Sequence, residues 1–136
     1  MASVVEFEDD SGQVFHYARH ANGGGLVSVQ ARVHADATVA ATAYIEAGAT
    51  VGARSRIGTG CWLEHDVSVG QDVAVAGNVH VGPRTRIDDG ARIGTVARVG
   101  SGVVIHRGAR IAPDAVVPDG AVVRRRSRRS DFGIAA

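Results

Sequence analysis

The sequence contains no lysine, one cysteine and few aromatic residues, and each of these scarcities limits what the protein can be. All fifteen basic residues are arginine, which together with the many Ala, Val and Gly residues indicates a bacterial source with a GC-rich genome. The single cysteine, Cys61, has no partner for an intrachain disulfide, so a cytoplasmic location is predicted. Because aromatic residues make up only 4% of the chain, small aliphatic side chains must build the interior.

Long apolar stretches and an excess of charge are also missing. No apolar run is long enough to cross a membrane, and the first ten residues lack the basic and apolar regions of a signal peptide. A net charge of +1 predicts no strong attraction to nucleic acid or other polyanions. With 136 residues, the chain has the length of one domain.

A repeat of six residues dominates what is present. A Val, Ile or Leu stands at every sixth position from Val27 to Val123, which makes seventeen hexads, and Ala, Ser, Cys, Val or Thr follows four positions later in each. When each hexad is counted from its large aliphatic residue, positions three and four hold turn dipeptides such as Asp89-Gly90. Because side chains alternate along a strand, positions five and one point inward, and positions six and two point outward.

Each hexad is therefore a short strand and a corner, and three hexads close a triangular coil. Stacked coils bury a core that no single repeat could bury, so we predict an all-β, single-stranded parallel β-helix of about five to six coils. Residues 1–26 are expected to form a β-hairpin and a Gly-rich hinge that cap it, residues 27–128 the β-helix, and residues 129–136 a tail. The alanines at position five are expected to face the narrow corners: Ala37, Ala43, Ala49, Ala91, Ala97, Ala109, Ala115 and Ala121.

The hexads resemble those of the bacterial hexapeptide-repeat superfamily. Its consensus has an aliphatic residue, a Gly, Ala or acidic residue, two variable residues, a small residue and a variable one. Three segments that meet this consensus are Ile57-Gly58-Thr59-Gly60-Cys61-Trp62, Val69-Gly70-Gln71-Asp72-Val73-Ala74 and Ile93-Gly94-Thr95-Val96-Ala97-Arg98. The resemblance implies a left-handed β-helix, although parallel crossovers are right-handed in about 98% of cases. It also implies a homo-oligomer, with a trimer favoured, and many members are acyltransferases.

One outward column holds the largest side chains of the repeat region. Residues eighteen apart stack on one face, and the position-six column of the first face reads Leu26, Tyr44, Trp62, His80, Arg98 and Val116. Glu46 and Glu64 stand beside this column in position two. Large apolar side chains on an outer surface mark an interface or a ligand wall. We therefore predict that Tyr44, Trp62, His80, Arg98 and Glu46 lie between subunits or beside a ligand.

His80 is the candidate general base, because imidazole exchanges a proton near neutral pH, and Glu64 is the candidate partner that would fix its tautomer. Acyltransferases of the superfamily are similar in using one histidine in a cleft between subunits, which implies an acyl-CoA donor. Two features depart from that pattern. No inserted loop interrupts the hexads, and the Asn-Pro-Ala-Lys-type ending of many O-acetyltransferases is absent.

No metal site is predicted. The γ-class carbonic anhydrases share the fold and hold a metal through histidines of neighbouring subunits, but their His-x-x-x-x-His spacing does not occur here. A pairing of His65 with His80 of another subunit is the one metal alternative that the spacing leaves open. Cys61 falls on an inward position and is expected to be a core residue.

Arginines form two further clusters. Arg56, Arg92 and Arg110 share an outward column on the third face, which we interpret as a solvated surface or, alternatively, as a surface for the phosphates of a coenzyme or a nucleic acid. The candidate anion-binding cluster near the C-terminus comprises Arg124, Arg125, Arg126, Arg128 and Arg129. No aromatic residue interleaves with this cluster to stack on bases, so an end cap is preferred and an acidic partner comes second.

The preferred functional prediction is an oligomeric scaffold for assembly or interaction, which binds protein partners through a flat face or the basic tail and needs no cofactor. The alternative is an acyltransferase-like enzyme that uses an acyl-CoA donor between subunits, and a carbonic anhydrase-like metal enzyme is the third possibility. The regularity of the hexads favours the first function, whereas the resemblance favours the second.

Overall fold

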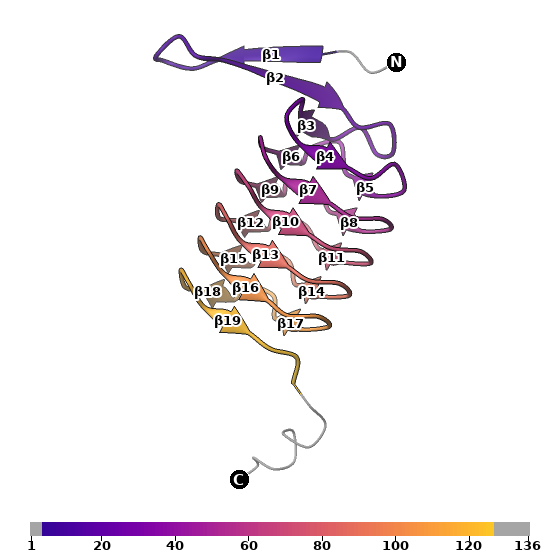
Figure 1. Cartoon of the computed structure of the whole chain (residues 1–136), viewed down its shortest axis with the longest axis vertical. Helices are drawn as coiled ribbons and strands as arrows, with labels where there is room; N and C mark the ends of the chain where they lie inside the picture. The colour runs from indigo at the N-terminus through magenta and orange to yellow at the C-terminus, as the bar shows by residue number, and fades with distance from the viewer. Residues whose placement is uncertain (1–3, 127–136) are drawn as a thin grey trace.

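The computed structural model describes residues 4–126 and shows a parallel β-helix with a hairpin at its N-terminal end (Figure 1). Within these residues lie nineteen strands, and β3 to β19 are the strands of the predicted hexads. They form five complete coils and two thirds of a sixth. The predicted all-β architecture, a β-helix of five to six coils preceded by a hairpin, is confirmed. No helix among residues 4–126 is long and apolar enough to cross a membrane.

The strands line up in three sheets, one on each face of the prism (Figure 1). The first face holds β1 (Val4–Glu8), β2 (Val14–Arg19), β3 (Leu26–Ser28), β6 (Tyr44–Ile45), β9 (Trp62–Leu63), β12 (His80–Val81), β15 (Arg98–Val99) and β18 (Val116–Val117). The second face holds β4 (Arg32–Val33), β7 (Thr50–Val51), β10 (Ser68–Val69), β13 (Arg86–Ile87), β16 (Val104–Ile105) and β19 (Val122–Val123). The third face holds β5 (Thr38–Val39), β8 (Arg56–Ile57), β11 (Ala74–Val75), β14 (Arg92–Ile93) and β17 (Arg110–Ile111).

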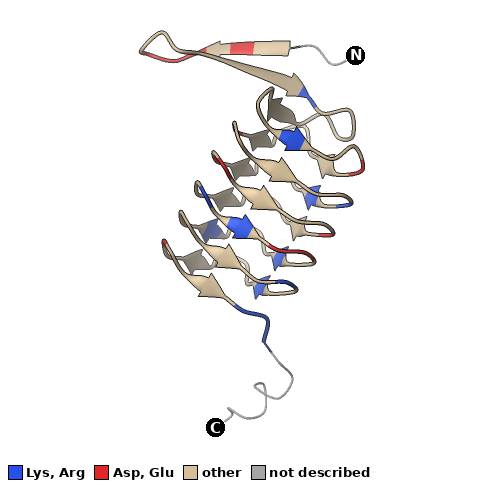
Figure 2. Cartoon of the chain, viewed as in Figure 1, with Lys and Arg blue, Asp and Glu red and all other residues tan. Residues whose placement is uncertain are grey.

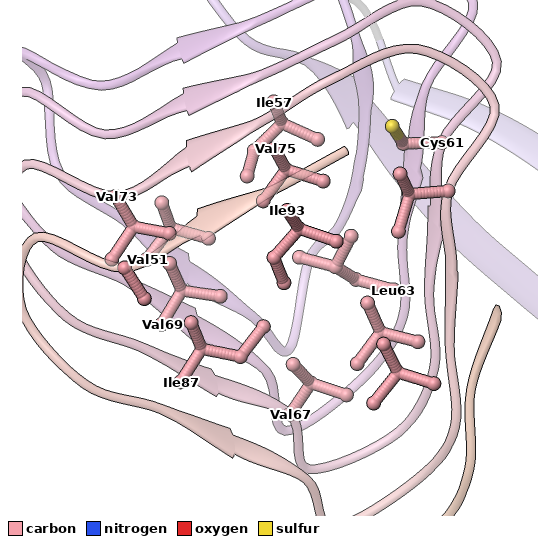
Figure 3. Close-up of a cluster of buried hydrophobic side chains, with 14 of the residues drawn as sticks. Val51, Ile57, Cys61, Leu63, Val67, Val69, Val73, Val75, Ile87 and Ile93 are labelled. Atoms are coloured by element: carbon pink, nitrogen blue, oxygen red, sulfur yellow. The ribbon is translucent and has the colours of Figure 1, made fainter. Parts of the chain in front are cut away.

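Positions one and five of the hexads point inward and build one continuous aliphatic core (Figure 3). The fully buried corner alanines are Ala37, Ala43, Ala49, Ala91, Ala97 and Ala109. Ala115 and Ala121 are only partly buried, because they lie next to the last, incomplete coil. Cys61 is buried as predicted, and its Sγ lies 2.8 Å from the Ala76 carbonyl oxygen.

Within residues 4–126, Ser55 and Thr85 are hydroxyl residues at inward corner positions, and both hydroxyls are hydrogen-bonded. Ser55 Oγ donates to the Gly70 carbonyl oxygen at 2.6 Å and accepts the Val73 N–H at 3.0 Å. The Thr85 hydroxyl is also paired, because it donates to a backbone carbonyl and accepts a backbone N–H of the next coil. A small polar residue is therefore tolerated at these corners, since both roles of the hydroxyl are satisfied by neighbouring backbone.

The corners depend on a left-handed backbone at position four. From Gly48 to Gly120, each position-four residue has a positive φ, between 56° and 80°. Glycine, asparagine and aspartate adopt this conformation at low cost, and they fill most of these corners. Val96, with a φ of 64°, is the β-branched exception.

The hairpin extends the first face beyond the first coil. Its turn is held by Asp9, whose Oδ1 accepts hydrogen bonds from the Ser11 hydroxyl and from two backbone N–H groups, which lowers the pKa of Asp9. Strand β2 pairs antiparallel with β3. After β2, the Gly25 N–H donates to the Val39 carbonyl oxygen at 3.0 Å. A Cβ on Gly23 would lie 2.2 Å from that same oxygen, so the glycine-rich segment permits close packing on β5.

Charged residues of both signs are spread along the coils, and the two ends of the described chain differ in charge. Figure 2 shows acidic positions in the hairpin and a basic stretch after the last strand. Arg124, Arg125 and Arg126 form that stretch, directly after β19. The remaining members of the predicted cluster, Arg128 and Arg129, and the predicted tail 129–136 lie outside the described residues.

Candidate functional site

The outward aromatic column lies on the first face, where the eighteen-residue register stacks its members. His80 of β12 is paired with Trp62 of β9 on one side and with Arg98 of β15 on the other. The rings of Trp62 and His80 are stacked, with centroids 4.7 Å apart and planes 24° from parallel. Tyr44 and Trp62 are 38% and 44% exposed, so much of each ring is accessible in the single chain.

His80 is hydrogen-bonded to Glu64. His80 stands at position six of its hexad, and Glu64 stands at position two of a hexad in the preceding coil. Residues in these two positions are diagonal neighbours on the sheet surface, so long side chains can reach each other. His80 Nε2 lies 2.5 Å from Glu64 Oε2, and both side chains are part-buried. When the carboxylate accepts the Nε2–H, the Nδ1 of the imidazole carries the free lone pair. The ring can then act as a base through Nδ1.

Glu46 connects the hairpin to the aromatic column. Its carboxylate accepts hydrogen bonds from the Tyr17 hydroxyl and, at 2.8 Å, from the indole N–H of Trp62. Burial, together with the bond to Glu46, raises the pKa of Tyr17 well above its usual range. Tyr17 also packs edge-to-face against Phe7 and Tyr44, with ring centroids 5.5 and 6.2 Å away. The Trp62 ring that stacks on His80 is thus fixed from the hairpin side.

Sequence analysis did not include Tyr17 in the site. The hexad register could not place it, because Tyr17 lies before the repeats and reaches Glu46 only through the pairing of β2 with β3. The available signal was an aromatic residue in an alternating strand next to an aromatic column.

A groove of about 500 Å³ lies beside His80 on the side toward the C-terminal coils. It is lined by Glu64, His80, Arg98 and the backbone of Gly82 and Gly100, among others. A Cβ on Gly82 would lie 2.7 Å from the Gly100 carbonyl oxygen, so close stacking of the coils requires this glycine. The same requirement leaves the groove floor next to the imidazole without side chains.

A second cavity, of about 310 Å³, lies between β2 and the first coils. Its lining includes His16, Tyr17, Glu46 and His65. His65 is exposed at the corner directly after Glu64, so it is the other histidine near the two carboxylates of the first face. Among residues 4–126, no three His, Cys, Asp or Glu side chains are grouped so that they could hold a metal ion.

Comparison with known proteins identifies relatives in structure rather than in sequence. No protein-family model and no curated protein sequence matches the chain. PerB from Caulobacter crescentus, solved in complex with CoA and GDP-perosamine, is 26% identical and covers 73% of this chain and 48% of its own, with a TM-score of 0.72. A mutant of perosamine N-acetyltransferase from Caulobacter crescentus, with the same two ligands, is also 26% identical, with 73% and 47% covered and a TM-score of 0.72.

A third structure shows the fold alone. The acetyltransferase domain of PglB from Neisseria gonorrhoeae FA1090, solved in complex with acetyl coenzyme A, is 23% identical over 73% of this chain and 53% of that domain, with a TM-score of 0.64. The present chain therefore spans about half the length of the structures that it resembles.

These similarities contradict the prediction of a non-catalytic scaffold, because the two structures that are 26% identical contain CoA and GDP-perosamine, and one of them is a mutant of a perosamine N-acetyltransferase. Regular hexads are a requirement of coil stacking, so enzymes with this fold share them and regularity says nothing against catalysis. The first face has a groove beside His80 although no inserted loop interrupts the hexads. The hexads, the three parallel sheets and these neighbours together show that the chain belongs to the hexapeptide-repeat superfamily of left-handed parallel β-helices.

Proposed function

We propose that the protein is an acyltransferase that moves an acyl group from an acyl-CoA thioester to an amine or hydroxyl group. The observation that carries the proposal is the hydrogen-bonded pair of His80 and Glu64, which is stacked on Trp62 and borders an open groove. Support comes from the fold, because a structure that is 26% identical contains CoA and GDP-perosamine.

The proposed role of His80 is that of a general base. Glu64 would hold the Nε2–H, so that Nδ1 takes the proton that the acceptor loses as its nitrogen or oxygen bonds to the acyl carbon. The carbon–sulfur bond of the thioester breaks in the same exchange, and the imidazolium returns the proton to the leaving sulfur. Trp62 would keep the imidazole plane in place through the stacked contact.

The groove beside His80 fits a narrow donor arm. Its floor at Gly82 and Gly100 carries no side chains, and its volume of about 500 Å³ is in the range of small-molecule sites. Arg98, at the edge of the groove, would offer a positive charge to a phosphate of the donor. Because the PerB complex contains GDP-perosamine, nucleotide-linked amino sugars are the acceptors to test first.

The exposed rings of Tyr44 and Trp62 support a homo-oligomer in which the aromatic column faces a neighbouring subunit. A cytoplasmic homotrimer remains the proposed state of the protein. In that assembly the groove would lie at a subunit boundary, and the neighbouring subunit would close its open side.

The proposal is tested by calorimetry with coenzyme A and by an assay of thiol release from acetyl-CoA with nucleotide-linked amino sugars. Wild-type protein is expected to bind coenzyme A and to release thiol only when an acceptor is present. His80→Gln should keep coenzyme A binding and lose about 10²–10⁴-fold in rate, because only proton transfer is removed. Its matched control is His106→Gln, which removes a half-exposed histidine on the second face and should leave the rate unchanged.

A further variant separates the two histidines near Glu64. If His65→Gln abolishes turnover while His80→Gln does not, the base is His65 and the assignment of His80 is wrong. If wild-type protein neither binds coenzyme A nor releases thiol with any acceptor, the acyltransferase proposal is refuted.

A further inference from the structure

The third face carries a groove that the acyltransferase proposal does not use. The groove has a volume of about 570 Å³, and three arginines line it, namely Arg56, Arg92 and Arg110. Its floor is built from small residues, which include Ala74, Ala76, Gly94 and Ala112. Figure 2 shows β8, β14 and β17 as basic strands on one side of the prism, with the uncharged β11 between β8 and β14.

Within residues 4–126, Arg56, Arg92 and Arg110 form no ion pair with a carboxylate. They differ in this from Arg54, Arg86 and Arg107, which are paired with Asp72, Asp88 and Asp89. Arg92 and Arg110 are direct partners in neighbouring parallel strands, so their Cα atoms are separated by one strand spacing of about 4.8 Å. Like charges in this arrangement repel each other, and an anion bound between them would remove that repulsion.

The spacing of the three arginines along the third face determines which anions they can bind together. Arg92 and Arg110 lie one coil apart and can bind two linked phosphates, whereas Arg56 lies two coils from Arg92 across Ala74. Guanidinium groups bind phosphate oxygens in a bidentate manner. The apolar floor between Arg56 and the pair of Arg92 and Arg110 leaves room for a planar ring and a sugar. These features fit a small molecule with a diphosphate at one end and a nucleoside in the middle.

A nucleic acid fits this face less well. The outward column of the third face offers only a short track of positive charge. It contains three arginines, and the column begins with the uncharged Thr38. Among the described residues, no aromatic side chain lines the groove to stack on successive bases, as in proteins that bind single-stranded nucleic acids tightly. A single nucleotide needs neither a long charged track nor a row of stacking rings.

We infer that the third face binds the diphosphate of a nucleotide, held by Arg92 and Arg110, with Arg56 at the far end of the groove. The inference does not rest on the proposed acyl transfer, because His80 and its groove lie on the first face. Two sources share this chemistry, the 3′-phospho-ADP part of coenzyme A and the nucleoside diphosphate part of an activated sugar.

The test is calorimetric titration of the full chain with ADP, inorganic pyrophosphate and adenosine. ADP and pyrophosphate should bind, and adenosine should bind at least tenfold more weakly than ADP. Arg92→Gln and Arg110→Gln should each weaken ADP binding by tenfold or more, and Arg92→Lys, which keeps the charge but not the planar fork, should weaken it less. Arg32→Gln is the matched control, because Arg32 is an exposed arginine in the same outward position on the second face.

Two further binding measurements identify the source of the nucleotide. If the coenzyme is the source, Arg92→Gln should weaken coenzyme A binding by tenfold or more. If an activated sugar is the source, GDP-mannose should displace ADP, while coenzyme A binding should not change in Arg92→Gln. His80→Gln should leave ADP binding unchanged, so a failure of acyl transfer is distinguishable from a failure of this site.

The inference is overturned if ADP does not bind at millimolar concentration, or if Arg92→Gln and Arg110→Gln bind ADP as the wild type does. Melting temperatures of Arg92→Gln and Arg110→Gln should equal or exceed that of the wild type, because each of these substitutions removes a repulsion between like charges. Equal folding with lost binding then assigns the effect to the arginines themselves.

Discussion

Val96 occupies a corner that valine disfavours, so we expect Val96→Asn to stabilise the protein. Its φ is 64°, in the left-handed region, where a β-branched side chain crowds the backbone. The stacked corner residues one coil before and one coil after are Asn78 and Asp114, with φ values of 58° and 62°. Both are residue types that adopt this region readily. Asparagine at position 96 would therefore continue a column that the fold already uses.

The magnitude follows from three contributions. A left-handed conformation costs an L-residue roughly 1–2 kcal/mol, and asparagine avoids much of that cost. The Val96 side chain is 41% exposed, so its replacement forfeits only part of the burial of one valine. The backbone N–H of residue 96 keeps its 3.0 Å hydrogen bond to the Gly77 carbonyl oxygen. We expect a net gain of about 1 kcal/mol, which corresponds to about 3 °C in melting temperature for a chain of this length.

The measurement is thermal and guanidinium unfolding followed by circular dichroism. Val96→Gly should gain less than Val96→Asn, because glycine adds conformational freedom to the unfolded chain. Val122→Asn is the control, since Val122 is also an exposed valine but lies in strand β19, where asparagine is disfavoured. If Val96→Asn is no more stable than the wild type, or behaves like Val122→Asn, the argument from corner conformation is wrong.

Two further predictions concern the core. Ala97→Leu should lower the stability by about 1–3 kcal/mol, because Ala97 is completely buried at a narrow corner, whereas Ala41→Leu at an exposed corner should be nearly neutral in thermal unfolding. Cys61 should resist alkylation by iodoacetamide at pH 8 and react once guanidinium unfolds the chain, because burial raises the pKa of its thiol and leaves little thiolate in the folded state. Rapid labelling of the native protein would contradict the buried position of Cys61.

Most of the fold was predictable because the inward residues themselves repeat. A large residue such as Ile93 and a small one such as Ala97 recur at fixed positions, and the geometry of a closed coil follows from their alternation. The hand of the β-helix could not be derived from this pattern, because parallel crossovers are normally right-handed, and it came from the resemblance to known hexads. Ala115 and Ala121 follow the same pattern but are only partly buried, because they lie next to the last, incomplete coil.

Only the site residues that belong to the hexads could be placed from the sequence, because the eighteen-residue register of the coils applies to them alone. The stacking of Trp62 on His80 follows from their separation of eighteen residues, and the diagonal neighbour Glu64 was identified as a possible partner of His80 from the same register. The function could not be inferred in this way. Hexads that stack regularly are needed by every member of the fold, so their regularity does not distinguish a scaffold from an enzyme.

Chemistry on this fold depends on the outward side chains that the repeat leaves unspecified. The period of six determines where Glu46 and Trp62 lie, but hydrogen bonds fix their orientation. The Glu46 carboxylate accepts one bond from the Trp62 indole and another from the hydroxyl of Tyr17, a hairpin residue that precedes the hexads. The same holds on the third face, where the outward residues of β8, β14 and β17 contribute nothing to the buried core. Because outward positions are free of the packing constraint, a charge or an aromatic ring recurring there in register requires an explanation other than folding. Such columns are therefore the places at which to look for ligands in a chain of otherwise uniform hexads.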